Sequence, residues 1–251
     1  MNKKALLITC GIAFAFFGLA FSLMFSGGNI VEALQSGDTS RVKLLLSIGA
    51  DPETAVDNGR MLLHMAAING DAEMIRLLAD HLDDLNTLDE KGYSALHYAA
   101  ENGRTSAAQT LLELGADINA PRRGMERPIH DALAKGNLET AGMLLAAGAS
   151  LTATNDMGVT ALHFAAGQGD TDLVNKMLAM NPDVNASSKI GWTPLHTACT
   201  TDNEQVVRML IAAGAKLDSL TVHGQTPEKI AEQNNKTNLV AVIKASSVPS
   251  P

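Results

Sequence analysis

Five histidines recur at a constant spacing of 33 residues, and histidine is a common metal ligand and proton carrier near neutral pH. Zinc ligands must each reach one ion within about 2.0–2.1 Å, whereas the units of a helical solenoid stack roughly 8–10 Å apart. The five rings therefore cannot share an ion, and we predict a structural role without metal or cofactor. They are His64, His97, His130, His163 and His196.

The remaining reactive side chains form no catalytic pattern in the sequence. Cys199 falls in a register where other units carry alanine, which predicts a small buried packing residue rather than an exposed thiol. The carboxylate pairs Asp83-Asp84 and Asp89-Glu90 fall at expected helix ends and turns, with no nucleophile or phosphate-binding glycine loop beside them. We expect no enzyme activity and no small-molecule substrate.

The composition favours packed helices and disfavours nucleic-acid binding. Of the 251 residues, 46% are hydrophobic but only 4% are aromatic, which suits Ala- and Leu-rich helices better than β-sheets. The formal net charge is -8, and a sequence-independent nucleic-acid binder needs a dense Lys/Arg surface to neutralise phosphates. We therefore expect a protein partner and no nucleic acid.

The elements that must position the histidines repeat with the same period. A turn-forming glycine stands five residues before the histidine in four units, and Met125 takes its place in the other. A short Ala-rich helix follows, then a second Gly or Asn, then another helix with apolar residues at helical spacing. That helix ends at Gly-Ala in several copies, where glycine can adopt the left-handed conformation that closes a helix. Seven such units fill residues 28–244.

The sequence around the histidine resembles the ankyrin-repeat pattern Gly-x-Thr-Pro-Leu-His-x-Ala. Residues 191–198 read Gly-Trp-Thr-Pro-Leu-His-Thr-Ala, and residues 158–166 and 92–100 are close variants. The resemblance extends over the chain except for an N-terminal segment and a Ser/Pro tail. It implies β-turn fingers that project from stacked helix-turn-helix units, with each histidine hydrogen-bonding from the first helix to the adjoining turn.

The resemblance predicts an all-α repeat solenoid of about seven ankyrin repeats, preceded by one N-terminal hydrophobic helix. We expect the hydrophobic segment over residues 1–27, the repeat domain over residues 28–244 and a flexible tail over residues 245–251. Neither helix of a unit is long enough to be stable alone, so neighbouring units must stack to bury their apolar sides. The units, numbered 1 to 7 below, are expected near residues 28–55, 56–88, 89–121, 122–154, 155–187, 188–220 and 221–244.

Two units depart from the pattern, and we expect local distortion in both. In unit 2, residues 61–64 read Met-Leu-Leu-His and lack the Thr and Pro that suit the start of the first helix. In unit 5, residues 181–183 read Asn-Pro-Asp where Gly-Ala is expected. The first and last units are atypical, as expected of caps with one face toward solvent.

The N-terminus has the features of a membrane segment. Lys3 and Lys4 precede residues 5–25, which carry no charge and are long enough to span a bilayer as an uncleaved helix. The alternative is a cleaved signal peptide, whose apolar core is usually shorter, about 7–15 residues. Either way the lysines stay in the cytoplasm, so the repeat domain is expected outside it, in the periplasm of a Gram-negative bacterium. The chain therefore resembles an exported or membrane-anchored bacterial type of ankyrin-repeat protein.

Ankyrin-type proteins usually bind partners with their finger tips and the exposed side of their first helices, where the units of this chain differ most. The register after the turn glycine holds the only Trp and one of two Tyr residues, and Trp, Tyr and Arg most often anchor interfaces. Unit 4 adds a cluster of arginines that is expected to meet an acidic patch. The alternatives are aromatic rings that lie against their own fingers and arginines that are simply solvated. The candidate partner-binding residues are Tyr93, Arg122, Arg123, Glu126, Val159, Ile190 and Trp192.

These features favour a protein-interaction module outside the cytoplasmic membrane that acts as scaffold, accessory or inhibitor of one protein partner. The alternative is a redox, haem- or metal-handling accessory of the exported compartment, with a His or Met ligand. The eleven methionines mostly occupy core registers or the N-terminal segment, which disfavours this alternative. A structural oligomer held by the N-terminal helix is a third hypothesis, with only a weak small-residue pattern to support it.

Overall fold

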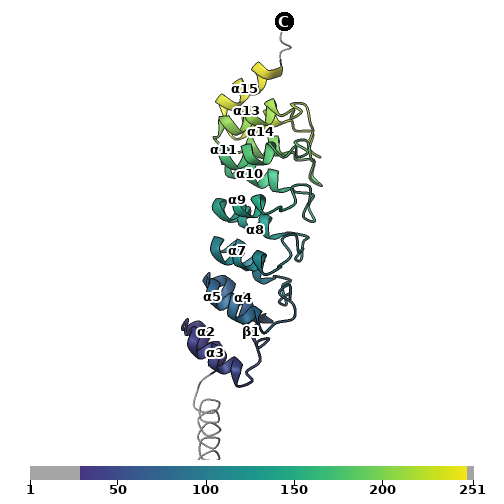
Figure 1. The fold of residues 1–251 in the computed structure, drawn as a ribbon. Coiled ribbons are helices and arrows are strands. Elements are labelled where there is room, and N and C mark those ends of the chain that lie inside the picture. Colours follow the sequence, from purple (N-terminus) through teal and green to yellow (C-terminus); the bar gives the residue numbers. More distant parts are fainter. Residues whose placement is uncertain (1–28, 248–251) are drawn as a thin grey trace, which may run out of the picture.

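The computed structural model describes residues 29–247 of the chain. Within this range, antiparallel helices pair and stack into a single column, and the loops between successive pairs project to one side (Figure 1). This arrangement confirms the all-α repeat solenoid. The seven pairs, one for each unit, are α2 (Ile30–Gln35) with α3 (Thr39–Ser47), α4 (Leu62–Asn69) with α5 (Ala72–Ala79), α6 (Ala95–Glu101) with α7 (Thr105–Glu113), α8 (Pro128–Ala134) with α9 (Leu138–Ala146), α10 (Ala161–Gln168) with α11 (Thr171–Leu178), α12 (Pro194–Ala198) with α13 (Glu204–Ala212), and α14 (Pro227–Gln233) with α15 (Thr237–Ser247).

The first helices begin where the sequence pattern predicts. Thr193 is the N-cap of α12, its side chain accepts a hydrogen bond from the His196 amide, and Pro194 occupies the first helical position. In unit 2, Met61 is the N-cap of α4 without a hydroxyl, yet α4 begins in the same register. The expected distortion is absent there because His64 still accepts the Met61 amide hydrogen at 3.0 Å.

The last nine residues of each loop that precedes a first helix form the fingers, which comprise residues 53–61, 86–94, 119–127, 152–160, 185–193 and 218–226. The first finger contains a small antiparallel hairpin of β1 (Ala55–Asp57) and β2 (Arg60–Met61). Four of the five pairs of successive fingers are joined by a single backbone hydrogen bond, for example from Lys189 N to Met157 O at 2.8 Å and from Val222 N to Ile190 O at 3.0 Å. Most fingers are therefore tied to a neighbour rather than being independent loops.

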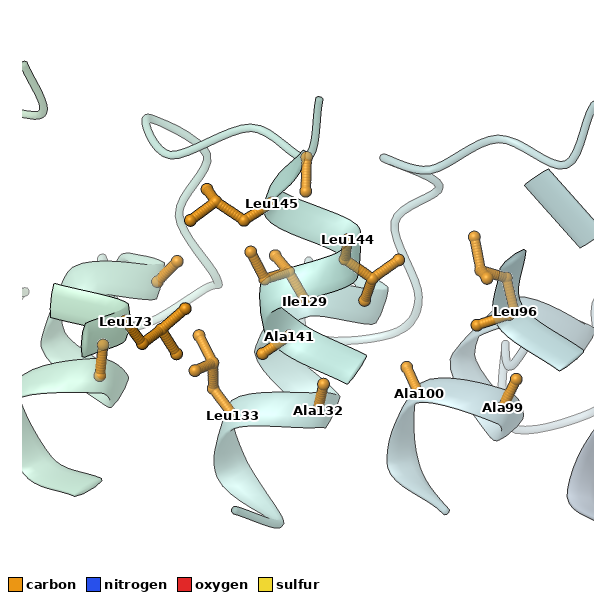
Figure 2. Packing of buried hydrophobic residues seen from close by; sticks show 14 of the residues in the cluster. Leu96, Ala99, Ala100, Ile129, Ala132, Leu133, Ala141, Leu144, Leu145 and Leu173 are labelled. Atoms are coloured by element: carbon orange, nitrogen blue, oxygen red, sulfur yellow. The ribbon is translucent and has the colours of Figure 1, made fainter. Parts of the chain in front are cut away.

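The core lies between the stacked helices and consists mainly of leucine and alanine (Figure 2). Ala99 and Ala100 of α6 and Ala132 of α8 are fully buried, and such small side chains allow neighbouring helices to approach closely. Cys199, at the end of α12, is also fully buried, and burial raises the pKa of its thiol to about 12. Cys199 therefore stays a neutral packing residue, as its register predicts.

Left-handed residues close the helices. Gly70 and Gly169 end α4 and α10 with φ values of 80° and 75°. In unit 5, Asn181 replaces the expected glycine and adopts a φ of 51°, so this unit is not distorted. Asparagine reaches this conformation at low cost because its short polar side chain can hydrogen-bond locally. Both departures from the repeat pattern are thus accommodated without a change of fold.

The two predicted terminal segments have different outcomes. Helix α15 continues to Ser247, so residues 245–247 are helical rather than part of a flexible tail. The hydroxyls of Ser246 and Ser247 donate to the carbonyls of Val242 and Lys244, which allows serine to remain in the last turn. The predicted hydrophobic segment over residues 1–27 and the end of the tail lie outside the described residues. Within residues 29–247, none of the helices has the length and hydrophobicity to cross a bilayer.

Candidate functional site

The five spaced histidines tie each first helix to its own cap and, in four cases, to a neighbouring finger. In every one, Nδ1 accepts the amide hydrogen of the N-cap residue at 3.0–3.2 Å. Nε2 therefore carries the proton and donates to a carbonyl oxygen of the following finger. The acceptors for His64, His97, His163 and His196 are Thr87, Glu126, Trp192 and Gln225, at 3.1, 3.4, 3.0 and 3.1 Å.

His130 is the exception to this pattern. Its Nε2 is buried and has no hydrogen-bond partner, while its ring packs against Phe164 with centroids 5.8 Å apart. Burial lowers the pKa of His97 and of His130 to about 4, so both rings are neutral at pH 7. Neutral, hydrogen-bonded rings suit a structural role. Among residues 29–247, no three His, Cys, Asp or Glu side chains are grouped closely enough to hold a metal ion.

The residues in the register after the turn glycines are all partly buried, and those of units 3 and 4, Tyr93 and Glu126, are linked through Arg122. The ring of Tyr93 stacks on Tyr98 at 4.9 Å, and the Arg122 guanidinium lies over Tyr93 at 4.5 Å. Arg122 also forms ion pairs with Asp131 and Glu126, both at 2.7 Å. These residues build an internal network rather than a set of free contacts.

This network takes up Arg122, one residue of the arginine cluster that was predicted to meet an acidic patch. The Arg122 side chain is only 18% exposed, and it forms its ion pair with Asp131 of α8, which is 5% exposed. Burial raises the pKa of Asp131 to about 6 although Arg122 opposes the shift. Arg127 donates to the carbonyls of Met125 and Thr154, which leaves Arg123 as the exposed arginine of this finger. The sequence had not indicated that a buried aspartate would pair with Arg122.

Units 5 and 6, in contrast, bring three predicted residues together around an open hollow of about 440 Å³. Val159, Ile190 and Trp192 line it from the fingers, together with Met157, and Phe164 of α10 lines it from the first helices. Trp192 packs beside His196 with ring centroids 6.1 Å apart. We name this feature the apolar hollow. Tyr93, Arg122, Arg123 and Glu126 do not line it.

Small residues of the first helices leave room for the apolar hollow. Ala134 and Gly167 line it at positions where units 2 and 3 carry Ile68 and Glu101. Sequence analysis did not identify Ala134, Gly167 or Phe164 as site residues. The sequence feature that could have identified them is this register, in which units 2 and 3 carry large side chains and units 4 and 5 carry alanine and glycine.

A second hollow of similar size lies over units 2 to 4 and is polar. Arg60, Tyr98, Glu101 and Lys135 are among its lining residues. Lys135 pairs with Glu101 at 3.1 Å, and Arg60 lies over the Tyr98 ring at 6.0 Å. The two hollows are adjacent because Ala134 lines the apolar one and Lys135 lines the polar one.

Exposed large hydrophobic side chains gather on the fingers. Among the described residues, the two that lie elsewhere are Leu44 on α3 and Met180 beyond α11 at the base of a loop. Exposed large apolar side chains that recur along one face are typical of interaction surfaces. We call the fingers together with the exposed side of the first helices the finger face. Its exposed large hydrophobic residues are Leu88, Met125, Met157, Ile190, Leu220 and Val222.

Stacked helix pairs, projecting fingers and a repeated capping histidine define a repeat protein that presents a surface rather than an enclosed site. The family model for ankyrin repeats matches residues 30–122, 129–221 and 162–247. The chain therefore belongs to the ankyrin-repeat family.

Two solved structures illustrate this similarity. The ankyrin repeat domain of human ASB11 has a TM-score of 0.76 and 24% identity, over 88% of this chain and 99% of that one. An ankyrin repeat domain from Acinetobacter baumannii AYE has a TM-score of 0.67 and 32% identity, over 74% of this chain and 98% of that one. No curated protein matches the chain. Ankyrin repeats indicate a protein–protein interaction module.

Proposed function

We propose that the chain is a non-catalytic module that holds one protein partner on its finger face, as scaffold, accessory or inhibitor. The observation that carries this proposal is that most exposed large hydrophobic residues of the described chain lie on the fingers, and that two of them, Met157 and Ile190, line the apolar hollow. Contact between hydrophobic surface and water is unfavourable. Each Å² of this surface that a partner covers stabilises the complex by roughly 25 cal/mol.

The proposed location is outside the cytoplasmic membrane. It rests on the sequence of the N-terminus, where two lysines precede an uncharged stretch over residues 5–25. Alkaline phosphatase, which is active only after export, can be fused behind the full chain and expressed in a Gram-negative host. Activity in intact cells is expected, and activity confined to a cytoplasmic β-galactosidase fusion at the same position would contradict export.

The finger face can be tested by photo-crosslinking in cells of the source organism. A photoreactive amino acid at position 190 should capture one protein, while the same amino acid at position 180 should capture none. Ile190 and Met180 are similarly exposed, at 43% and 50%, but only Ile190 lies on the finger face. The purified partner should then bind the parent chain about tenfold or more tightly than the Trp192→Ala variant. Equal capture at both positions would refute the proposal.

A further inference from the structure

We propose that the apolar hollow takes a single bulky, uncharged side chain, aliphatic or aromatic, from the protein partner. This inference rests on the proposed function and specifies the chemistry of the partner. The volume of about 440 Å³ falls within the usual range of ligand pockets, roughly 300–1,000 Å³. It therefore has room for one large side chain and its backbone.

The lining of the apolar hollow explains why the inserted side chain must be uncharged. No Asp, Glu, Lys or Arg lines it, and its histidine, His163, already binds the Thr160 amide and the Trp192 carbonyl. Burial lowers the pKa of His163, so this ring stays neutral at pH 7. A charged side chain would lose water there without gaining a counter-ion, which is strongly unfavourable.

The position of the apolar hollow follows from one register of the first helices. Ile68 and Glu101 project side chains at this register in units 2 and 3, whereas Ala134 and Gly167 have almost none. The space in front of Ala134 and Gly167 is bounded instead by Met157, Ile190 and other finger residues. The missing side chains on the helices thus define the volume that a partner residue can fill.

The walls of the apolar hollow are held in place before any partner arrives. The Trp192 carbonyl accepts from His163 at 3.0 Å, and the Trp192 ring packs beside His196. The carbonyls of Met157 and Ile190 accept hydrogen bonds from the next fingers at 2.8 and 3.0 Å. Binding to such a preformed site loses little conformational entropy. Met157 and Ile190 stay 51% and 43% exposed at the rim until the site is filled.

Blocked amino acids can test this inference with the full chain in lipid nanodiscs. Trp192 is the only tryptophan, so its fluorescence reports directly on the apolar hollow. N-acetyl-leucinamide and N-acetyl-phenylalaninamide should change its emission with a Kd of roughly 1–10 mM, given their small size. N-acetyl-lysinamide and the α-amide of N-acetyl-aspartic acid, which keeps its side-chain carboxylate, should give no saturable response. A response to the charged amides equal to that of the apolar ones would overturn the inference.

A pair of methionines provides an internal control. Met157 and Met180 are nearly equally exposed, at 51% and 50%, but only Met157 lines the apolar hollow. In methyl NMR spectra, the apolar amides should shift the Met157 ε-methyl resonance and leave that of Met180 in place. Equal shifts would indicate unspecific adsorption or partition into lipid, and would overturn the inference.

Two variants test whether N-acetyl-leucinamide binds in the apolar hollow. Ala134→Leu fills the apolar hollow from an exposed helix position, and Ile190→Lys introduces the residue type that unit 3 carries as Lys91 in the same register. Each should weaken binding of N-acetyl-leucinamide by about fivefold or more, whereas Met180→Lys should not change it. Unchanged affinity in both hollow variants would place the probe elsewhere and overturn the inference.

The proposed function fails separately from this inference. Capture of a partner through position 190, together with no response to any apolar amide, would leave the interaction module in place without an anchoring side chain. Conversely, binding of the apolar amides together with no capture at position 190 would contradict the proposed function, and a partner would no longer be the source of the side chain.

Discussion

At the scale of single residues, the buried histidines make the chain sensitive to acid. Burial lowers the pKa of His97 to about 4, while an unfolded histidine titrates near 6.5. Above pH 6.5 the His97 ring is neutral in both the folded and the unfolded chain, so protonation of this ring does not lower the free energy of unfolding. Between pH 6.5 and 4 the unfolded chain binds more protons, so the free energy of unfolding falls as the pH is lowered.

The pH dependence can be assigned to one ring by substitution. His97→Gln should be less stable than the parent at pH 7, and the difference should shrink between pH 6.5 and 4, as measured by urea unfolding. Asp131, whose pKa burial raises to about 6, acts in the opposite direction, so the comparison between parent and variant is the informative quantity. A difference that stays constant with pH would contradict the role of His97.

Arg122 supports a buried carboxylate, and its removal should be costly at neutral pH. Arg122→Met leaves Asp131, which is 5% exposed, without a counter-ion and should destabilise the chain by about 3 kcal/mol at pH 7. The loss should be smaller at pH 5, because Asp131 without Arg122 takes up a proton more readily. The double variant Arg122→Met, Asp131→Leu should recover most of the stability. Chemical denaturation at both pH values measures the free energy of unfolding of the parent, the single variant and the double variant.

At the scale of elements, the fingers depend on glycine where two backbones approach closely. A Cβ on Gly191 would lie 2.7 Å from the Thr221 Cα, whereas one on Gly115 would meet nothing within 4 Å. Both glycines have positive φ values, 78° and 98°. Alanine at either position should therefore lower the free energy of unfolding by about 1–2 kcal/mol through backbone strain.

The additional loss at Gly191 measures the contact between fingers. Gly191→Ala should be less stable than Gly115→Ala by about 1–3 kcal/mol in thermal or urea unfolding, because the finger of unit 7 must move away. Equal losses in the two variants would show that this contact between fingers does not contribute to stability.

At the scale of the whole molecule, a solenoid is stabilised by contacts between neighbouring units only. Among the described residues, α2 and α3 pack against unit 2 alone, and α14 and α15 against unit 6 alone, whereas α8 contacts both α6 and α10. Backbone amides of α2 and α14 should therefore exchange with solvent faster than those of α8 and α10. Hydrogen-exchange mass spectrometry measures this gradient, and uniform exchange along the column would contradict it.

The sequence by itself determined the repeat, the start of the first helices that carry the Thr-Pro pattern, and the hydrogen-bonding role of the histidines. These properties follow from local chemistry that recurs every 33 residues, such as the Thr193 cap, Pro194 at the first helical position and the closing glycines. The two departures from the pattern were misjudged, because asparagine at position 181 can replace glycine and His64 can hold a cap without threonine.

Only the tertiary structure decided which exposed positions are free to bind. Tyr93, Arg122 and Trp192 are all interface-forming residue types at or beside the finger register. Arg122, however, pairs with Asp131 and lies over the Tyr93 ring, whereas Trp192 lines an open hollow. The difference arises from side chains of neighbouring helices, since Asp131 fills one site and Ala134 and Gly167 leave the other empty. The Arg122–Tyr93 contact and the lining of the hollow join residues of different units, and the Arg122–Asp131 pair joins a finger to the helix that follows it, so the repeat pattern alone cannot reveal them.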